Sequence, residues 1–267
     1  MHRETVENAA FRAGYLAILT FMLLPLAVVV ATSFEASGQL LFPPENYSLV
    51  HYRAFFEETR WLSAFDNSLL VGAGTTVVAT TLGVTAAFGH ELDDGRTGQV
   101  LAPLVLVPLL IPPIILGISM RVYFVRAGLN ASFLSIILAH TLWATPLVYF
   151  VMRSVFSRFD WQLLDAAKDL GAGPLQSFAY AVLPNVKHGI FVGALLAFIV
   201  SLQEFVMALF LSSHSTETIP VVAWTALRQS LDPMVSVVST FLILISIIAI
   251  VVATLATNLE WLSKQLS

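Results

Sequence analysis

Glu204 is the residue of this sequence whose chemistry is hardest to reconcile with its surroundings. It is the one formally charged residue in the otherwise uncharged run 188–213, and Gln203 precedes it. A carboxylate near the middle of a bilayer costs roughly 2.5–3.5 kcal/mol on insertion scales, so such a group usually lines a cavity or meets a partner. Two readings stay open. Glu204 and Gln203 line the path of a cationic solute, or Glu204 is a structural carboxylate paired with a neighbouring helix or subunit.

Other residues with chemical potential form no catalytic pattern. His140 lies in an apolar run and is expected to be a structural histidine. The sequence has no cysteine, and its His, Asp and Glu residues show no metal-ligand spacing. It has no Gly-x-x-x-x-Gly-Lys-Ser/Thr phosphate loop and no nucleophile with a base nearby. We therefore expect a chain that is not an enzyme and binds no cofactor or metal itself.

A second distinctive segment is the longest polar loop between two apolar runs, residues 157–188, called here the signature loop. Within it, 161–170 predicts a short amphipathic helix with Asp160 as its N-cap. Gly171 suits the left-handed turn that ends such a helix. Pro174 can begin a second helix, and Pro184 is expected to disrupt it. We expect a helix-turn-helix near the membrane surface.

The signature loop resembles the cytoplasmic loop of bacterial ATP-binding-cassette importers. That loop runs Glu-Ala-Ala, three residues, Gly, nine residues, Ile, one residue, Leu-Pro. The matching residues here are Asp165, Ala166, Ala167, Gly171, Leu183 and Pro184, with Ala181 in place of the Ile. The resemblance implies that these residues couple the chain to a separate ATP-hydrolysing subunit, which would hold the ATP and Mg.

Composition places the chain in a membrane. Hydrophobic residues make up 57% of it and charged residues 11%, whereas soluble domains carry about 25% charge. Six runs have the roughly 20 residues that a spanning helix needs: 13–34, 67–89, 97–120, 127–152, 188–213 and 233–259. Only helices and closed barrels satisfy the backbone in lipid. We expect an all-α polytopic protein with six transmembrane helices, the first retained rather than cleaved; the resemblance implies a type I importer permease.

Lysine and arginine favour the cytoplasmic side. With both termini inside, eight of these residues fall in cytoplasmic segments and five outside: Arg3, Arg12, Arg96, Arg153, Arg158, Lys168, Lys187 and Lys264 against Arg53, Arg60, Arg121, Arg126 and Arg228. The expected organisation follows from this orientation. It comprises a cytoplasmic N-terminus (1–12), a peripheral first helix (13–34), a periplasmic loop (35–66), a permease core (67–259) that includes the signature loop, and a cytoplasmic C-terminus (260–267).

Two apolar runs carry packing and bending signals. Pro103, Pro108, Pro112 and Pro113 crowd the third run and predict a broken helix that serves as a gate element. In the fifth run, Gly189 and Gly193 begin a stripe of small residues that we interpret as a helix-packing surface. The long outer loop reads either as a solvated loop or as a docking face, with a short helix 49–60 capped by Ser48.

The likeness to importer permeases extends beyond the signature loop, and its nearest subgroup is the second permease of spermidine/putrescine importers. Segments that carry it are Asn67-Ser68-Leu69, 112–118, 201–205 and 217–220. The resemblance implies a bacterial inner-membrane permease for a small solute, with a polyamine-like amine favoured. Its partners would be an ATP-binding subunit dimer, a sister permease and a periplasmic solute-binding protein. Alternatives are an ion-coupled secondary transporter, with Glu204 and His140 as ion-linked groups, and a non-transporting scaffold or receptor.

Overall fold

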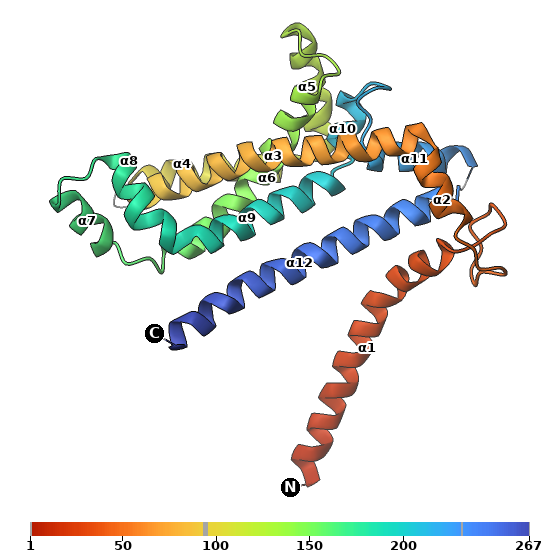
Figure 1. The fold of residues 1–267 in the computed structure, drawn as a ribbon, viewed down its shortest axis with the longest axis horizontal. Helices are drawn as coiled ribbons and strands as arrows, with labels where there is room; N and C mark the ends of the chain where they lie inside the picture. Colours follow the sequence, from red (N-terminus) through yellow and green to blue (C-terminus); the bar gives the residue numbers. More distant parts are fainter. Residues whose placement is uncertain (1, 93–95, 231, 267) are drawn as a thin grey trace. The chain divides into compact units, whose positions relative to one another are not determined.

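The computed structural model describes residues 2–92, 96–230 and 232–266, and every regular element within these ranges is a helix (Figure 1). The helices in chain order are α1 (His2–Thr32), α2 (Val50–Glu57), α3 (Thr59–Leu92), α4 (Arg96–Leu110), α5 (Pro113–Arg126), α6 (Phe133–Phe156), α7 (Gln162–Asp169), α8 (Pro174–Ser177), the π-helix η1 (Phe178–Val182), α9 (Leu183–Gln203), α10 (Val206–Leu211), α11 (Ile219–Ser230) and α12 (Met234–Leu266).

Five helical stretches among the described residues are long and apolar enough to cross a membrane. They are Phe11–Thr32, Thr59–Leu92, Phe133–Phe156, Pro174–Gln203 and Met234–Ala256. A sixth span arises if α4 and α5, which are bent by 102° at the break between them, together make one. The predicted all-α polytopic fold is confirmed.

The bend between α4 and α5 follows from consecutive prolines. A residue that precedes a proline is pushed from the helical region towards extended backbone. Ile111 precedes Pro112, and Pro112 precedes Pro113; Pro112 accordingly has ψ 132° and ends the helical path before α5 begins. Pro103 and Pro108 lie within α4 without breaking it. The predicted broken helix is therefore present at Pro112, whereas its role as a gate stays a prediction.

Several helices extend past the apolar runs that predicted them. α1 begins at His2, so most of the tail expected over 1–12 is helical, and α12 continues to Leu266. α3 begins at Thr59 rather than at residue 67, which shortens the outer loop. A charged residue ends the apolar run from which a span is predicted, but it does not end the helix. Its long side chain can extend to water while the backbone stays helical. Met1 and Ser267, the outermost residues of the two predicted tails, lie outside the described residues.

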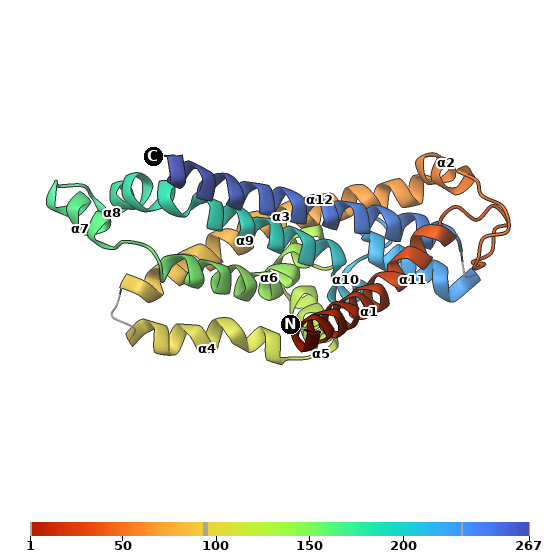
Figure 2. The ribbon, with the colours of Figure 1, turned by 90° about the horizontal axis from the view of Figure 1, so that it is seen from below.

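The chain divides into two compact units, Met1–Leu62 with Val222–Ile245, and Ser63–Val221 with Ser246–Ser267. In the second unit α6 and α9 lie side by side along much of their length (Figure 2). A Cβ at Gly189 would lie 2.5 Å from Cγ2 of Val155, and one at Gly193 would lie 3.2 Å from Cγ1 of Val148. The small-residue stripe of the fifth run thus packs against α6, as predicted.

The first unit contains the outer loop. Glu35 lies inside it: its carboxylate accepts hydrogen bonds from the backbone N–H groups of Ser37 (2.9 Å) and Glu45 (2.7 Å). These bonds hold the pKa of Glu35 below its ordinary value, and the bond from Ser37 makes the largest contribution. Ser48 accepts the N–H of Val50 at 3.1 Å, but the N-cap position of α2 falls on Leu49, which makes no side-chain cap bond, so the cap predicted at Ser48 is wrong by one residue. α2 is shorter than the expected helix 49–60, because Glu58 turns to extended backbone before α3.

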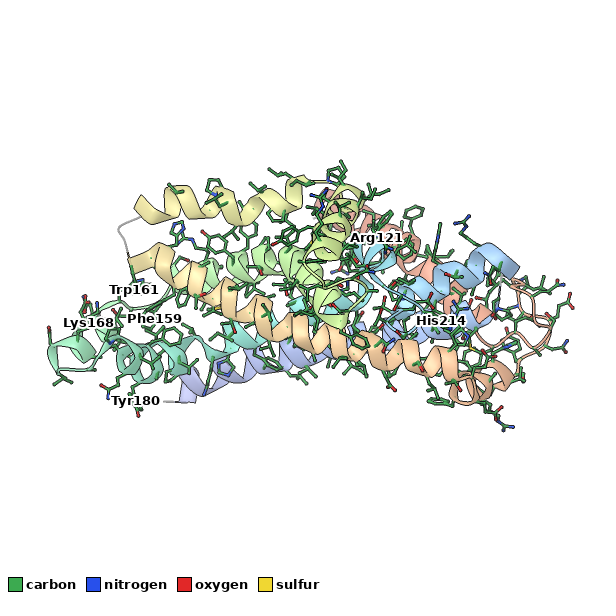
Figure 3. All side chains as sticks on the ribbon, turned by 90° about the horizontal axis from the view of Figure 1, so that it is seen from above. Arg121, Phe159, Trp161, Lys168, Tyr180 and His214 are labelled. Atoms are coloured by element: carbon green, nitrogen blue, oxygen red, sulfur yellow. The ribbon has the colours of Figure 1, made fainter. Side chains whose placement is uncertain are left out.

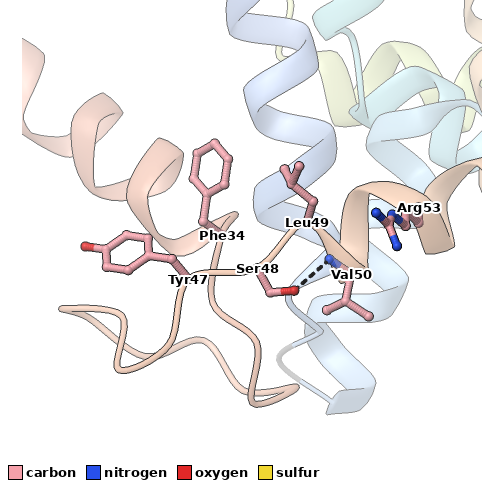
Figure 4. A pocket seen from close by; sticks show the side chains of 6 residues that line it. All are labelled: Phe34, Tyr47, Ser48, Leu49, Val50 and Arg53. Carbon is pink, nitrogen blue, oxygen red and sulfur yellow. Dashed lines mark hydrogen bonds between the residues drawn. The ribbon is translucent and has the colours of Figure 1, made fainter.

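Beside α2 the same loop forms an open, mostly apolar pocket (Figure 4). It is lined by Phe34, Tyr47, Ser48, Leu49, Val50 and Arg53. Tyr47 is 72% exposed there. Exposed aromatic groups of this kind are typical of surfaces that meet a partner or a membrane interface. This pocket is the place in the outer loop where the predicted docking face for an external partner would lie. The docking role stays a prediction.

Candidate functional site

The predicted docking helix exists as α7. The carboxylate of Asp160 accepts the N–H of Gln162 at 3.0 Å, but Trp161 occupies the N-cap position of α7 and makes no side-chain cap bond, so the cap predicted at Asp160 lies one residue too early. Leu164 is the buried residue of α7 and turns inward, whereas the Asp165 and Lys168 side chains are exposed and lie 3.2 Å apart. Lys168 projects at the outer end of the loop in Figure 3. The exposed face of α7 is therefore charged, and Leu164 is the side chain of α7 that is buried.

Gly171 ends α7 in the way that the sequence predicted. Its φ is +84°, in the left-handed region that side chains resist. The N–H of Gly171 donates to the carbonyl of Lys168 at 2.8 Å, and the N–H of Ala172 donates to that of Ala167 at 3.1 Å. This pair of bonds is the Schellman motif, which satisfies the last carbonyls of the helix. Ala166 is exposed and Ala167 half-buried beside it, so a partner can approach the backbone closely here.

The prediction for Pro184 is wrong in part. We expected it to disrupt the second helix before the fifth span, but α8, η1 and α9 form one helical stretch from Pro174 to Gln203. The proline removes a backbone donor and would crowd the carbonyl four residues earlier in an α-helix. Here the N–H of Leu183 reaches back five residues to Phe178, which widens the turn that Pro184 enters. Leu183 and Pro184 are both exposed.

Glu204 occupies a second break that the sequence did not reveal. The run 188–213 was expected to be one span, but α9 ends at Gln203 and Glu204 has ψ 122°. Its carboxylate accepts the N–H groups of Met207 (2.9 Å) and Ala208 (3.0 Å) in the first turn of α10. An acceptor at a helix start satisfies donors that the helix cannot. The sequence could not predict this break, because the polar residues Ser201, Gln203 and Glu204 interrupt the apolar run without a pattern that marks the end of a helix.

The same carboxylate meets a histidine from another helix. Nε2 of His140 on α6 lies 3.2 Å from Glu204, and Nδ1 of His140 lies 2.8 Å from the hydroxyl of Ser201. The side chains of His140 and Glu204 are 1% and 8% exposed. Gln203, in contrast, is exposed, and its Nε2 donates to the hydroxyl of Ser246 at 3.3 Å. Of the two predicted pathway residues, Gln203 is thus accessible and Glu204 is enclosed.

The cap residues of α10 have opposite charge. Arg121 of α5 donates to the carbonyl of Phe210 near the end of α10, while Glu204 caps its start. Anions are favourable at helix starts and cations at helix ends. A Cβ at Gly117 of α5 would lie 2.9 Å from the Phe210 ring, so α5 and α10 pack closely. Among the described residues, no group of three or more His, Cys, Asp or Glu residues has a geometry that could hold a metal ion.

Comparisons with known proteins assign this architecture to a family. The family described as binding-protein-dependent transport system inner membrane component matches residues 79–260. The chain belongs to this family and is a permease subunit of an ABC importer. A secondary transporter and a non-transporting scaffold are thereby set aside.

Individual relatives are consistent with this assignment. The chain is 26% identical over 258 residues to the spermidine/putrescine transport system permease protein PotC of Haemophilus influenzae, covering 97% of this chain and 98% of the relative. It is 30% identical over 235 residues to the putrescine transport system permease protein PotI of Escherichia coli, covering 84% and 82%. A chain of a bacterial ABC transporter involved in alginate import has the same fold, with a TM-score of 0.69, 17% identity and coverage of 96% and 97%.

Proposed function

We propose that this chain forms part of the solute pathway of an ATP-driven importer for a polyamine-like amine delivered by a periplasmic binding protein. A separate pair of ATP-binding subunits hydrolyses ATP with Mg, and a sister permease of different sequence completes the pathway. The chain lies in a bacterial inner membrane with both termini and the signature loop in the cytoplasm.

The docking role of the signature loop is supported by the form of α7. Its residues Asp165, Ala166 and Ala167 lie between a start held by the hydrogen bond from Gln162 to Asp160 and a Schellman end, on a helix whose side chains are mostly exposed. Small side chains let a partner's groove reach the backbone, and rigid ends keep the helix from fraying when it is pushed. This single observation supports the assignment of Asp165, Ala166, Ala167 and Gly171 to coupling, whereas Leu183 and Pro184 are assigned to it on the resemblance of the signature loop alone.

The preference for a cation is supported by the break at Glu204. A helix ends with a partial negative charge on its last carbonyls, and α9 ends within the apolar run at Gln203. The positive start of α10 is already offset by the Glu204 carboxylate. The negative end of α9, beside the exposed amide of Gln203, is therefore the end that attracts a cation. PotC and PotI, named for spermidine and putrescine, agree with this charge.

Uptake by the reconstituted importer tests the proposed cargo. The complete complex in proteoliposomes, with ATP inside and its binding protein outside, should accumulate labelled putrescine or spermidine. Excess unlabelled polyamine should compete, and a dicarboxylate of equal length should not. Competition by the dicarboxylate, or uptake that proceeds without ATP, would overturn the proposal.

The proposed orientation is open to a direct test because the sequence contains no cysteine. A cysteine introduced at Leu175, which is 82% exposed in α8, should react with an impermeant maleimide only after the membrane is opened. A cysteine at exposed Asn46 in the outer loop should react in intact cells. The reverse pattern would place the signature loop outside and remove the coupling role.

A further inference from the structure

Four aromatic rings from four segments meet at the base of the signature loop. Trp161, just before α7, stacks on Phe88 of α3 with ring centroids 6.1 Å apart and planes 29° apart. It also lies 6.0 Å from Phe156 of α6. Phe88 in turn lies 5.8 Å from Phe156 and 5.0 Å from Phe178 of η1. These four residues are called the aromatic clamp below.

The clamp connects α7 to the spans, while α7 itself is held by the buried side chain of Leu164 and by the backbone hydrogen bonds at its Schellman end. Leu164 is the buried residue within α7, and Trp161 belongs to the same apolar cluster. Phe159 meets the edge of Trp161 at 5.1 Å, and both lie at the inner side of the loop in Figure 3. Trp161 is thus the large rigid contact between the start of α7 and the spans.

The receiving side of the clamp is tied together. Arg153 of α6 forms an ion pair with Glu91 of α3, and Tyr149 of α6 forms a 2.7 Å hydrogen bond with His90 of α3. Phe88 lies within one turn of these two α3 residues, and Phe156 lies one turn beyond Arg153. A displacement of Trp161 therefore acts on α3 and α6 as a pair rather than on one side chain.

We propose that Trp161 is the positioning residue that transmits movement of α7 to α3 and α6 through the aromatic clamp. This inference rests on the proposed docking of an ATP-binding subunit on α7, and it deepens that proposal by naming the inward contact. The outward-facing residues of α7 meet the partner, while the indole, which is broad and has few rotatable bonds, converts their displacement into displacement of the spans.

The deciding experiment separates docking from transmission in the full importer complex. Trp161→Ala should leave association with the ATP-binding subunits and basal ATP hydrolysis unchanged. It should lower both uptake and the stimulation of hydrolysis by loaded binding protein by roughly two- to thirtyfold, as is typical of residues that couple distant sites. Trp161→Phe keeps a stacking ring and should restore most of the lost uptake. Tyr180→Ala, which removes an aromatic ring that is 81% exposed in η1, is the matched control and should transport normally.

A double-mutant cycle identifies the contact itself. If Trp161 acts through Phe88, the double variant Trp161→Ala with Phe88→Leu should lose no more uptake than Trp161→Ala alone. The effects of substitutions at residues in contact are not additive. Normal stimulation and uptake in Trp161→Ala would overturn the proposal, as would additive losses in the cycle. Loss of subunit association together with uptake would also overturn it, since Trp161 would then only hold α7 in place. Should Trp161→Ala fail to accumulate, Phe88→Leu with the same readouts decides. Docking is tested separately by Gly171→Val.

Discussion

Oε2 of Glu204 lies 3.2 Å from Nε2 of His140, so a carboxylate at the end of α9 is held against an imidazole within α6. The carboxylate also caps α10 through Met207 and Ala208. One side chain therefore joins three helices at the point where the fifth span breaks. Its enclosure and its partners favour the structural reading of Glu204, while Gln203 next to it has the exposure that a pathway residue needs.

Glu204→Gln should destabilise the complex more than it impairs transport. The amide offers one acceptor oxygen where the carboxylate offers two, and it lacks the charge that favours a helix start, so we expect a loss of about 1–2 kcal/mol. A lower melting temperature in detergent, with uptake per folded complex nearly unchanged, is the expected result. Gln203→Ala should show the opposite pattern. Lost uptake at an unchanged melting temperature in Glu204→Gln would assign Glu204 to the pathway.

Gly171→Val should weaken coupling to the ATP-binding subunits. The backbone at Gly171 has φ +84°, which costs an ordinary residue about 1–2 kcal/mol and a β-branched one more. The end of α7 should then shift, and co-purification of the ATP-binding subunit should fall. Gly173→Ala is the matched control, because Gly173 has φ −68° and open space around it. Equal co-purification by the two variants would argue against docking at α7.

Gly189→Ala should loosen the contact between α6 and α9. Its Cβ would lie 2.5 Å from a methyl group of Val155, and a valine in a helix has almost no alternative rotamer. Overpacking of this kind costs about 1–3 kcal/mol. Thermal unfolding should show a lower midpoint, and Val155→Ala in the same chain should restore it. Gly89→Ala, with nothing near its added Cβ, should unfold no earlier than the unmodified chain.

The outer loop should lose order in acid. Hydrogen bonds from Ser37 and Glu45 hold the pKa of Glu35 below its ordinary value of 4.5. A lowered pKa means that ionised Glu35 stabilises the folded loop at neutral pH, and that this stabilisation is lost as the pH falls below 4.5 through the folded pKa. Amide exchange at Ser37 and Glu45 should accelerate over that window. Glu35→Gln should exchange faster already at neutral pH and show no acid transition; an unchanged profile would contradict the assignment.

The sequence predicts this fold where the signals are local. Apolar runs of sufficient length reveal the spans, and α7 falls within a residue of its predicted ends because Asp160 and Gly171 act on adjacent backbone. The coupling residues are close in sequence, so their grouping on one loop was predictable. The pairing of Glu204 with His140 was not predictable, because it depends on the axial position at which α9 packs against α6. The break at Glu204 was missed because an apolar run looks the same whether or not its helix is continuous.

The π-helix η1 also links the length of the signature loop to Pro184. A π-turn holds one residue more than the α-turn that it replaces, and either turn completes one rotation, so α8 and α7 keep their orientation about the axis of α9 in both cases. Removing one residue of Phe178–Val182 would let the hydrogen bonds return to the α pattern without turning the loop. Pro184 would then enter an α-turn and crowd the carbonyl four residues earlier. The extra residue of η1 is therefore tied to the proline that follows it, and not to the direction in which the loop points.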